Sequence, residues 1–168
     1  MNRASKDGVR FRLRAIKSFE WGGAQPMVVP YEFLPDVALA DIAFEANSRT
    51  LNGLFQSCAI ALTEVMVDRK TLKPRSRKEI SLSSETLDTL LYDFLTEMII
   101  MKDVISFLAK RVTVRVDPTR PSLKCELGGE TISRSRHKLR NDVKAVTMHM
   151  FGIKKTPEGW ATTVVLDI

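Results

Sequence analysis

Residues 50–68 read TLNGLFQSCAIALTEVMVD, and this stretch decides the class of fold. Thr50 is a residue type that caps helices, because its hydroxyl can accept a hydrogen bond from a free N–H group of the first turn. Apolar side chains then recur at spacings of three and four: Leu51, Leu54, Phe55, Cys58, Leu62, Val65 and Met66. The spacing predicts an amphipathic helix from Thr50 to about Asp68. We expect its apolar stripe to lie on a β-sheet.

The segment before this helix reads YEFLPDVALADIAFEA (31–46), and its end alternates between apolar and mixed positions. One face carries Ile42, Phe44 and Ala46, and the other carries Asp41, Ala43 and Glu45. A period of two residues is typical of a β-strand. We therefore expect a strand with an acid, Asp41, on its less apolar face.

The segment after the first helix predicts another strand and another helix. RKEISLSS (77–84) is a short strand candidate, and Ser83 or Ser84 is placed to cap a helix that continues to about Lys102. The expected inner face of this helix consists of Leu87, Leu90, Leu91, Phe94, Leu95, Met98 and Ile99. The predicted order of elements up to residue 105 is thus strand, helix, strand, helix.

The last third of the chain changes to strand periodicity. Four strand-like runs follow one another: ISFLAKRVTVRVD (105–117), SLKCELGGE (122–130), NDVKAVTMHMFGI (141–153) and GWATTVVLDI (159–168). Asp-Pro, Gly-Gly and Pro-Glu-Gly act as turn signals between them. Short turns imply antiparallel neighbours. We expect an α+β fold in two layers, with two helices packed on one side of a largely antiparallel sheet.

Length and composition fit a single domain. The chain has 168 residues, and we expect a basic flexible leader over residues 1–28 and one domain over residues 29–168. No apolar run reaches the roughly 18 residues of a membrane span, and the first residues contain no apolar secretion segment. A cytoplasmic location and no membrane partner are the resulting predictions. Cys58 and Cys125 are interpreted as small core residues without a disulfide.

The net charge of +6 is distributed unevenly. Basic residues gather in the leader, in RKTLKPRSRK (69–78) and in RSRHKLR (134–140). Such clusters are compatible with contacts to RNA phosphates or to a protein that holds RNA, and equally with solvated loops. No aromatic residues are interleaved with them, so a platform for base stacking is poorly supported.

The familiar catalytic motifs are missing from the sequence. It contains no P-loop, no GxGxxG, no GxSxG and no HExxH, and His137 and His149 are not spaced as a helical zinc pair. The remaining chemistry is that of oxygen ligands. Asp41 lies in one predicted strand, and Asp167 lies beside Ile168 in another. If these strands are neighbours, the two carboxylates and an Ile168 oxygen could hold a hard cation such as calcium or magnesium.

Several short motifs, taken together, resemble the archease family. They are Ala40-Asp41, Thr50-Leu51, the segment 144–147 (KAVT) followed by His149, and Asp167-Ile168. They occur in the family's order over about residues 31–168. Two segments depart from the family pattern, because PDVALAD (35–41) lacks the usual His-Thr before Ala-Asp, and Thr96-Glu97-Met98 replaces an Asn-Glu-Leu-like stretch.

The resemblance implies an accessory protein with no catalytic residues of its own. Archeases assist the RNA-splicing ligase of transfer RNA splicing and RNA repair, promoting its guanylylation with GTP and its repeated turnover. That ligase joins ends bearing a 2′,3′-cyclic phosphate or 3′-phosphate to a 5′-hydroxyl. The resemblance makes Asp41, Asp167 and Ile168 the ligands of a divalent ion, calcium-like or magnesium or manganese. Candidate contacts to the partner or to RNA are Glu97, Arg136, His137, Lys144 and His149.

Two other classes of function stay open, and so does the oligomeric state. A metal-dependent hydrolase would need a further general base or a second metal close to Asp41 and Asp167. An RNA-binding or chaperone-like module would use the basic arms, and its salt-sensitive RNA affinity would survive loss of both aspartates.

Overall fold

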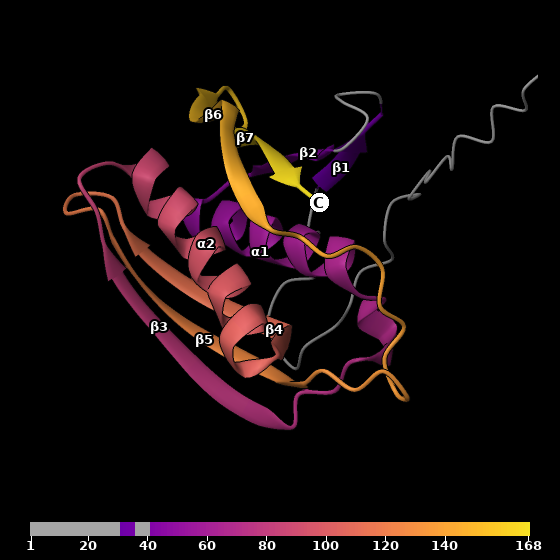
Figure 1. The fold of residues 1–168 in the computed structure, drawn as a ribbon. Helices are drawn as coiled ribbons and strands as arrows, with labels where there is room; N and C mark the ends of the chain where they lie inside the picture. The colour runs from indigo at the N-terminus through magenta and orange to yellow at the C-terminus, as the bar shows by residue number, and fades with distance from the viewer. Residues whose placement is uncertain (1–30, 36–40) are drawn as a thin grey trace, which may run out of the picture.

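The computed structural model describes residues 31–35 and 41–168 (Figure 1). The expected leader over residues 1–28 and the segment directly before Asp41 fall outside these residues. The elements in chain order are β1 (Tyr31–Leu34), β2 (Asp41–Ser48), α1 (Leu51–Met66), the 3-10 helix η1 (Arg69–Thr71), β3 (Ser76–Ser83), α2 (Leu87–Ile105), β4 (Phe107–Asp117), β5 (Ser122–Thr131), β6 (Ala145–Thr156) and β7 (Gly159–Asp167).

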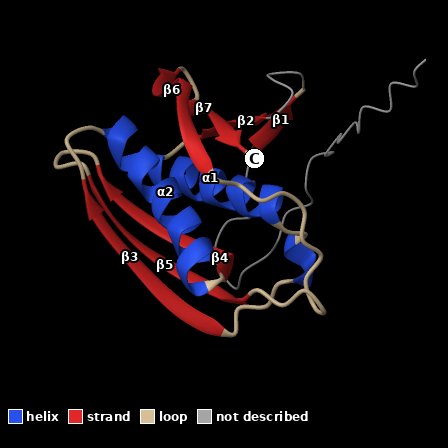
Figure 2. Cartoon of the chain, in the orientation of Figure 1, coloured by secondary structure: helices blue, strands red, loops and turns tan. Residues whose placement is uncertain are grey.

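The α+β class is confirmed, but the strands form two sheets instead of one. The first sheet has the order β1-β2-β7-β6 and the second has the order β3-β5-β4, and all of the strand pairs are antiparallel. Both helices lie between the two sheets (Figure 2). The expected two layers are therefore three, with β-strands on both sides of the helices.

The composition of α1 explains this third layer. Its side chains are buried around most of the helix, including the run Ser57, Cys58, Ala59, Ile60 and Ala61. A helix that is apolar on all sides must be covered on all sides. The spacing of three and four predicted one apolar stripe on α1. The small buried residues outside this stripe, such as Ser57, Ala59 and Ala61, allow α1 to pack against the second sheet as well. Cys58 and Cys125 are buried and unbonded to each other, as expected.

Each of the two α-helices begins at a threonine cap. The Thr50 hydroxyl accepts a hydrogen bond from the Gly53 N–H at 3.0 Å, which confirms the predicted start of α1. The cap of α2 is Thr86, not Ser83 or Ser84, and Thr89 completes a capping box with it. Ser83 is still part of β3. The sequence prediction was therefore two to three residues early at this boundary.

The Gly-Gly pair was predicted as a turn, and this prediction is wrong. Gly128 and Gly129 lie inside β5, between β3 and β4. A Cβ atom on Gly129 would lie 2.0 Å from the main-chain oxygen of Leu108, next to the register shift in β4. At Gly129 the neighbouring backbone approaches too closely for a side chain, which explains a glycine inside this strand.

β6 is an edge strand with a large bulge. Its ladder with β7 runs from Thr147, paired with Val165, directly to Gly152, paired with Thr163. Residues 148–151 thus stand opposite a single residue of β7. Met148 and Met150 are each 61% exposed there, and Met150 has a φ angle of 56°. A bulge of this kind interrupts the row of free backbone groups that an edge strand offers to other chains.

No helix among the described residues is long and apolar enough to cross a membrane.

Candidate metal centre

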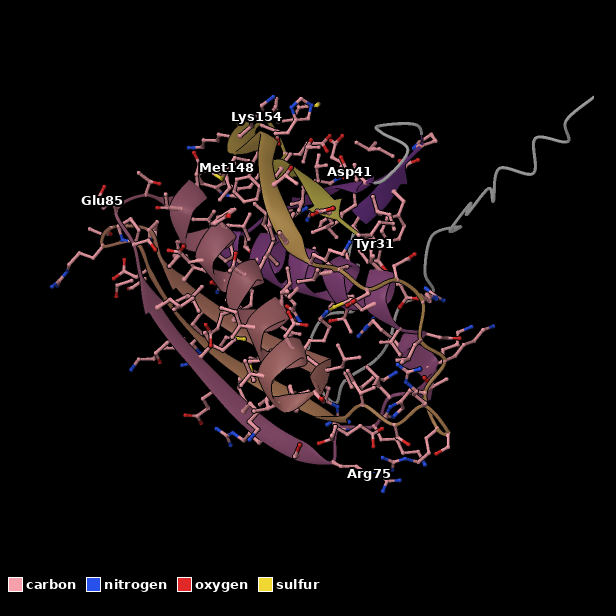
Figure 3. The ribbon with its side chains drawn as sticks, viewed as in Figure 1. Tyr31, Asp41, Arg75, Glu85, Met148 and Lys154 are labelled. Atoms are coloured by element: carbon pink, nitrogen blue, oxygen red, sulfur yellow. The ribbon has the colours of Figure 1, made fainter. Side chains whose placement is uncertain are left out.

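The pairing of β2 with β7 places the two predicted carboxylates opposite each other. Asp41 and Asp167 are register partners at one end of this ladder. Directly opposite residues of an antiparallel pair have Cβ atoms about 4.5–5.5 Å apart and point to the same face of the sheet. Figure 3 shows Asp41 beside the end of β7. The structure therefore brings together two acids from opposite ends of the described chain.

The surroundings of the two acids suit a bound cation. Both residues are half-buried, and like charges directly opposite each other on a sheet repel. Within the described part of the chain, the ion pairs formed by lysine and arginine involve other acids. A divalent ion between the carboxylates would relieve this repulsion.

Lys144 lies at the third strand of the site. Its N–H group donates a hydrogen bond to the main-chain oxygen of Asp167 at 2.8 Å, just before Ala145 pairs with Asp167. Its ammonium group is 3.4 Å from the main-chain oxygen of Ile168. Lys144 thus fixes the last two residues from the side of β6, and its exposed side chain leaves it accessible to an anionic partner.

The donor set consists of oxygen atoms, which suits a hard cation. No group of three or more aspartate, glutamate, histidine or cysteine side chains suited to a metal occurs in residues 31–35 and 41–168. The two carboxylates therefore need the main-chain oxygen of Ile168 and water to complete a coordination shell. A half-exposed site with few protein ligands fits an exchangeable ion better than a permanent structural one.

The other candidate residues lie elsewhere. His149 is exposed in the bulge of β6, where its N–H group is 3.4 Å from the Thr147 hydroxyl. Glu97 is half-buried on α2. Neither joins the two aspartates in a set of metal ligands within the described residues. Both stay predictions as contacts to a partner.

His137 was predicted as a candidate contact, and the structure places it in the interior. It is 5% exposed, and its Nδ1 atom accepts a hydrogen bond from the Ser133 N–H at 2.9 Å. The proton of the ring must then be on Nε2, which lies 2.9 Å from Oε1 of Glu130 and donates to it. We therefore correct this expectation: His137 organises its loop from inside. Arg136 beside it is exposed.

Glu130, the partner of His137, was not among the residues predicted from the sequence. Burial opposes its ionisation, but the hydrogen bonds from His137 and from the Lys73 N–H outweigh burial and lower the pKa of the carboxyl group. Arg75 and Arg136 lie 3.3 and 3.5 Å from its Oε2 atom. The only signal in the sequence was an acid at the end of a strand among many basic residues.

Lys102 was also missed, because its partner is far away in the sequence. Its ammonium group contacts Asp142 at 2.5 Å and the main-chain oxygen of Val143 at 2.9 Å, and also Asp103. Burial works against protonation of Lys102, but these carboxylates raise its pKa, and the Asp142 pKa is lowered in return. This contact ties the last turn of α2 to the segment that leads into Lys144.

Fold and site together define a small α+β protein with a pair of facing carboxylates at the end of a sheet. The sequence model of the Archease protein family (MTH1598/TM1083) matches residues 31–168. The chain therefore belongs to the archease family, and the resemblance seen in its motifs is confirmed.

Individual relatives agree with this assignment. The chain is 34% identical to the protein archease of Thermococcus gammatolerans over 132 residues, which cover 77% of this chain and 93% of that protein. It is 33% identical to the protein archease of Methanosarcina acetivorans over 141 residues, covering 82% and 95% respectively.

Two solved structures share the fold. The solution structure of Methanobacterium thermoautotrophicum protein 1598 has a TM-score of 0.69 and 30% identity, with 83% of this chain and 99% of that chain covered. A Thermotoga maritima crystal structure, described as an archease and possible chaperone, has a TM-score of 0.54 and 20% identity, with 77% and 91% covered. The second similarity concerns the fold alone.

Proposed function

We propose that this protein activates an RNA ligase of the RNA-splicing type, promoting its guanylylation and its repeated turnover through a divalent cation held at Asp41 and Asp167. The observation that carries the proposal is the register of β2 and β7, which sets the two carboxylates opposite each other. Membership of the archease family supports an accessory role, in which the ligase and not this chain performs the catalysis.

The chain's own residues have defined parts in this proposal. Asp41 and Asp167 supply charged oxygen ligands from two hydrogen-bonded strands, and the main-chain oxygen of Ile168 is the third. A divalent cation such as calcium, magnesium or manganese would supply positive charge that a nucleotide or phosphate group can approach. Lys144 holds the last residues in place and adds a second positive charge beside them.

Multiple-turnover RNA ligation by the cognate ligase, with GTP and a divalent metal, tests the proposal. We expect Asp41→Asn and Asp167→Asn each to lose the stimulation, because each removes a charged ligand without changing the size of the side chain. Glu45→Gln is the matched control, since Glu45 is an exposed acid on the same strand as Asp41. Full stimulation by both aspartate variants would rule out the carboxylate pair.

The same samples test the hydrolase alternative. Incubated with RNA and metal but without ligase, the wild-type protein should leave the RNA intact. Cleavage that disappears in Asp41→Asn would instead identify a metal-dependent nuclease and overturn the accessory role.

A further inference from the structure

Two basic segments that are far apart in the sequence meet in the fold. One follows α1 and covers residues 67–75, and the other joins β5 to β6 and covers residues 132–141. Together they carry seven exposed basic residues, which we name the basic surface: Lys70, Lys73, Arg75, Arg134, Arg136, Lys138 and Arg140. The guanidinium group of Arg140 is also paired with Glu64, at 2.7 Å. Figure 3 shows nitrogen-tipped side chains along this end of the molecule, with Arg75 among them.

Backbone hydrogen bonds join the two segments. The Asp68 N–H donates to the main-chain oxygen of Lys138 at 2.8 Å, and Val67 forms a β-bridge with Leu139. The Lys138 N–H lies 3.3 Å from the Thr71 hydroxyl. The two loops are therefore one structural unit, and their basic residues lie on adjoining segments of it.

The buried Glu130 holds this unit together without exposing its own charge. Its Oε1 atom accepts hydrogen bonds from His137 in one segment and from the Lys73 N–H in the other. Its Oε2 atom faces Arg75 and Arg136, again one from each segment. The Glu130 side chain is only 6% exposed, whereas those of Arg75 and Arg136 are 56% and 47% exposed. The acid is inside, and the cations are outside.

We propose that the basic surface binds the phosphate backbone of RNA. Its charge is complementary to a polyanion, and guanidinium groups match the geometry of phosphate oxygens. Neither segment contains a phenylalanine, tyrosine or tryptophan, and the ring of His137 is buried. These two segments therefore offer bases no aromatic ring to stack on, and we expect recognition mainly of the backbone, without sequence preference.

The basic surface leads directly to the carboxylate pair. The segment after β5 runs along the side of the molecule to the start of β6, beside the C-terminal end of β7 (Figure 1). Lys144 follows Arg140 by four positions, so their Cα atoms are at most about 14 Å apart. RNA on the basic surface would thus reach the aspartates. This last step rests on the proposed function, whereas the charge argument stands without it.

Binding of a short labelled oligouridylate to the full chain across a salt titration tests the proposal. Lys70→Gln with Lys73→Gln removes two charges from one segment, and Arg134→Gln with Lys138→Gln removes two from the other. The matched control, Arg115→Gln with Lys124→Gln, removes two exposed charges that face each other on β4 and β5. Residues 1–30 are present in every variant, so their basic residues do not affect the comparison.

Each pair of substitutions in the basic surface should weaken binding. The slope of log affinity against log salt should also fall by about 1.4, at about 0.7 for each phosphate that the protein no longer neutralises. The control pair should bind as the wild type does. RNA binding is measured without ligase and without divalent metal, so failure of the proposed function leaves this result unaffected.

Equal weakening in the control pair would reduce the effect to net charge and overturn the proposal. Unchanged RNA binding in both basic-surface pairs would overturn it as well. If those pairs bind RNA normally but no longer stimulate the ligase, the surface contacts an acidic patch of that protein instead. Thermal unfolding of each variant confirms that it is folded.

Discussion

At the scale of single residues, the proposed cation site predicts a change in stability, because directly opposed carboxylates repel each other and a bound cation would remove that repulsion. Without metal, Asp167→Asn should leave the free energy of unfolding unchanged or raise it, by about 0.2–1 kcal/mol, because it abolishes a like-charge pair. With calcium, the wild type should gain stability, by about 2.7 kcal/mol at a hundredfold excess over the dissociation constant, and the variant should gain much less. Thermal unfolding with calcium and with a chelator measures both effects.

Glu45→Gln is the control here too, and it should gain as much from calcium as the wild type. An Asp167→Asn protein that calcium stabilises fully would show that the ion binds elsewhere.

Glu130 makes the stability depend on pH with a known sign. Its pKa is lower in the folded state than in the unfolded chain, so its ionised form favours folding. This contribution is fully present above the ordinary carboxyl pKa and is lost as the pH falls through the lowered folded value. Glu130→Gln should therefore show a smaller loss of stability on acidification than the wild type, and a lower stability at neutral pH.

Urea unfolding at neutral and acidic pH measures this difference. Parallel stability curves for Glu130→Gln and the wild type would mean that Glu130 does not contribute to the acid response. The groups around Glu130 are His137, Arg75 and Arg136. Glu79→Gln provides the control, because Glu79 is exposed and pairs with Arg77 instead.

At the scale of elements, β5 depends on a glycine that no local pattern explains. Gly129→Ala would place a Cβ atom 2.0 Å from the Leu108 oxygen and 2.7 Å from the Phe107 ring. Because one of these neighbours is backbone, β4 and β5 must separate, and we expect a loss of about 1–3 kcal/mol in the free energy of unfolding. Gly152→Ala, with nothing within 4 Å of its Cβ position, should be neutral or slightly stabilising.

Denaturant unfolding of the two glycine variants provides the test. Equal free energies of unfolding would show that the backbone at Leu108 can move away from the new Cβ atom with little loss of stability.

The predictability of each element follows from the range of its interactions. The cap at Thr50 and the stripe of α1 are local, and the sequence predicted both. Gly129 of β5 is required by a neighbouring strand about twenty residues earlier in the chain, which no local pattern shows, so the Gly-Gly pair was predicted as a turn. The site behaves the same way: Asp41 and Asp167 were recognisable as strand acids, but their direct opposition required the register of β2 with β7.

At the scale of the whole molecule, the arrangement follows from α1. A period of three and four residues shows that a helix has a buried face, but it does not reveal how many sheets bury it. The small residues Ala59 and Ala61 complete a surface that needs cover on both sides. The apolar stripe alone is satisfied by one sheet, so the pattern predicted one sheet. The contact between residues 67–75 and residues 132–141 is also long-range in the sequence. The sequence of either basic cluster alone therefore could not predict it.

The strand order β1-β2-β7-β6 also determines at which stage of folding Asp41 and Asp167 can come together. β7 separates β2 from β6, so neither neighbour can complete its ladder before β7 has been synthesised. The chain between β2 and β7 forms a long loop. Closing it is slow, because the chain loses conformational entropy before the strand pairing compensates for that loss. A nascent or truncated chain without β7 has Asp41 but no facing carboxylate. If the two aspartates hold a cation as proposed, only chains in which β7 has paired with β2 would bind it, so cation binding would report that this sheet has assembled.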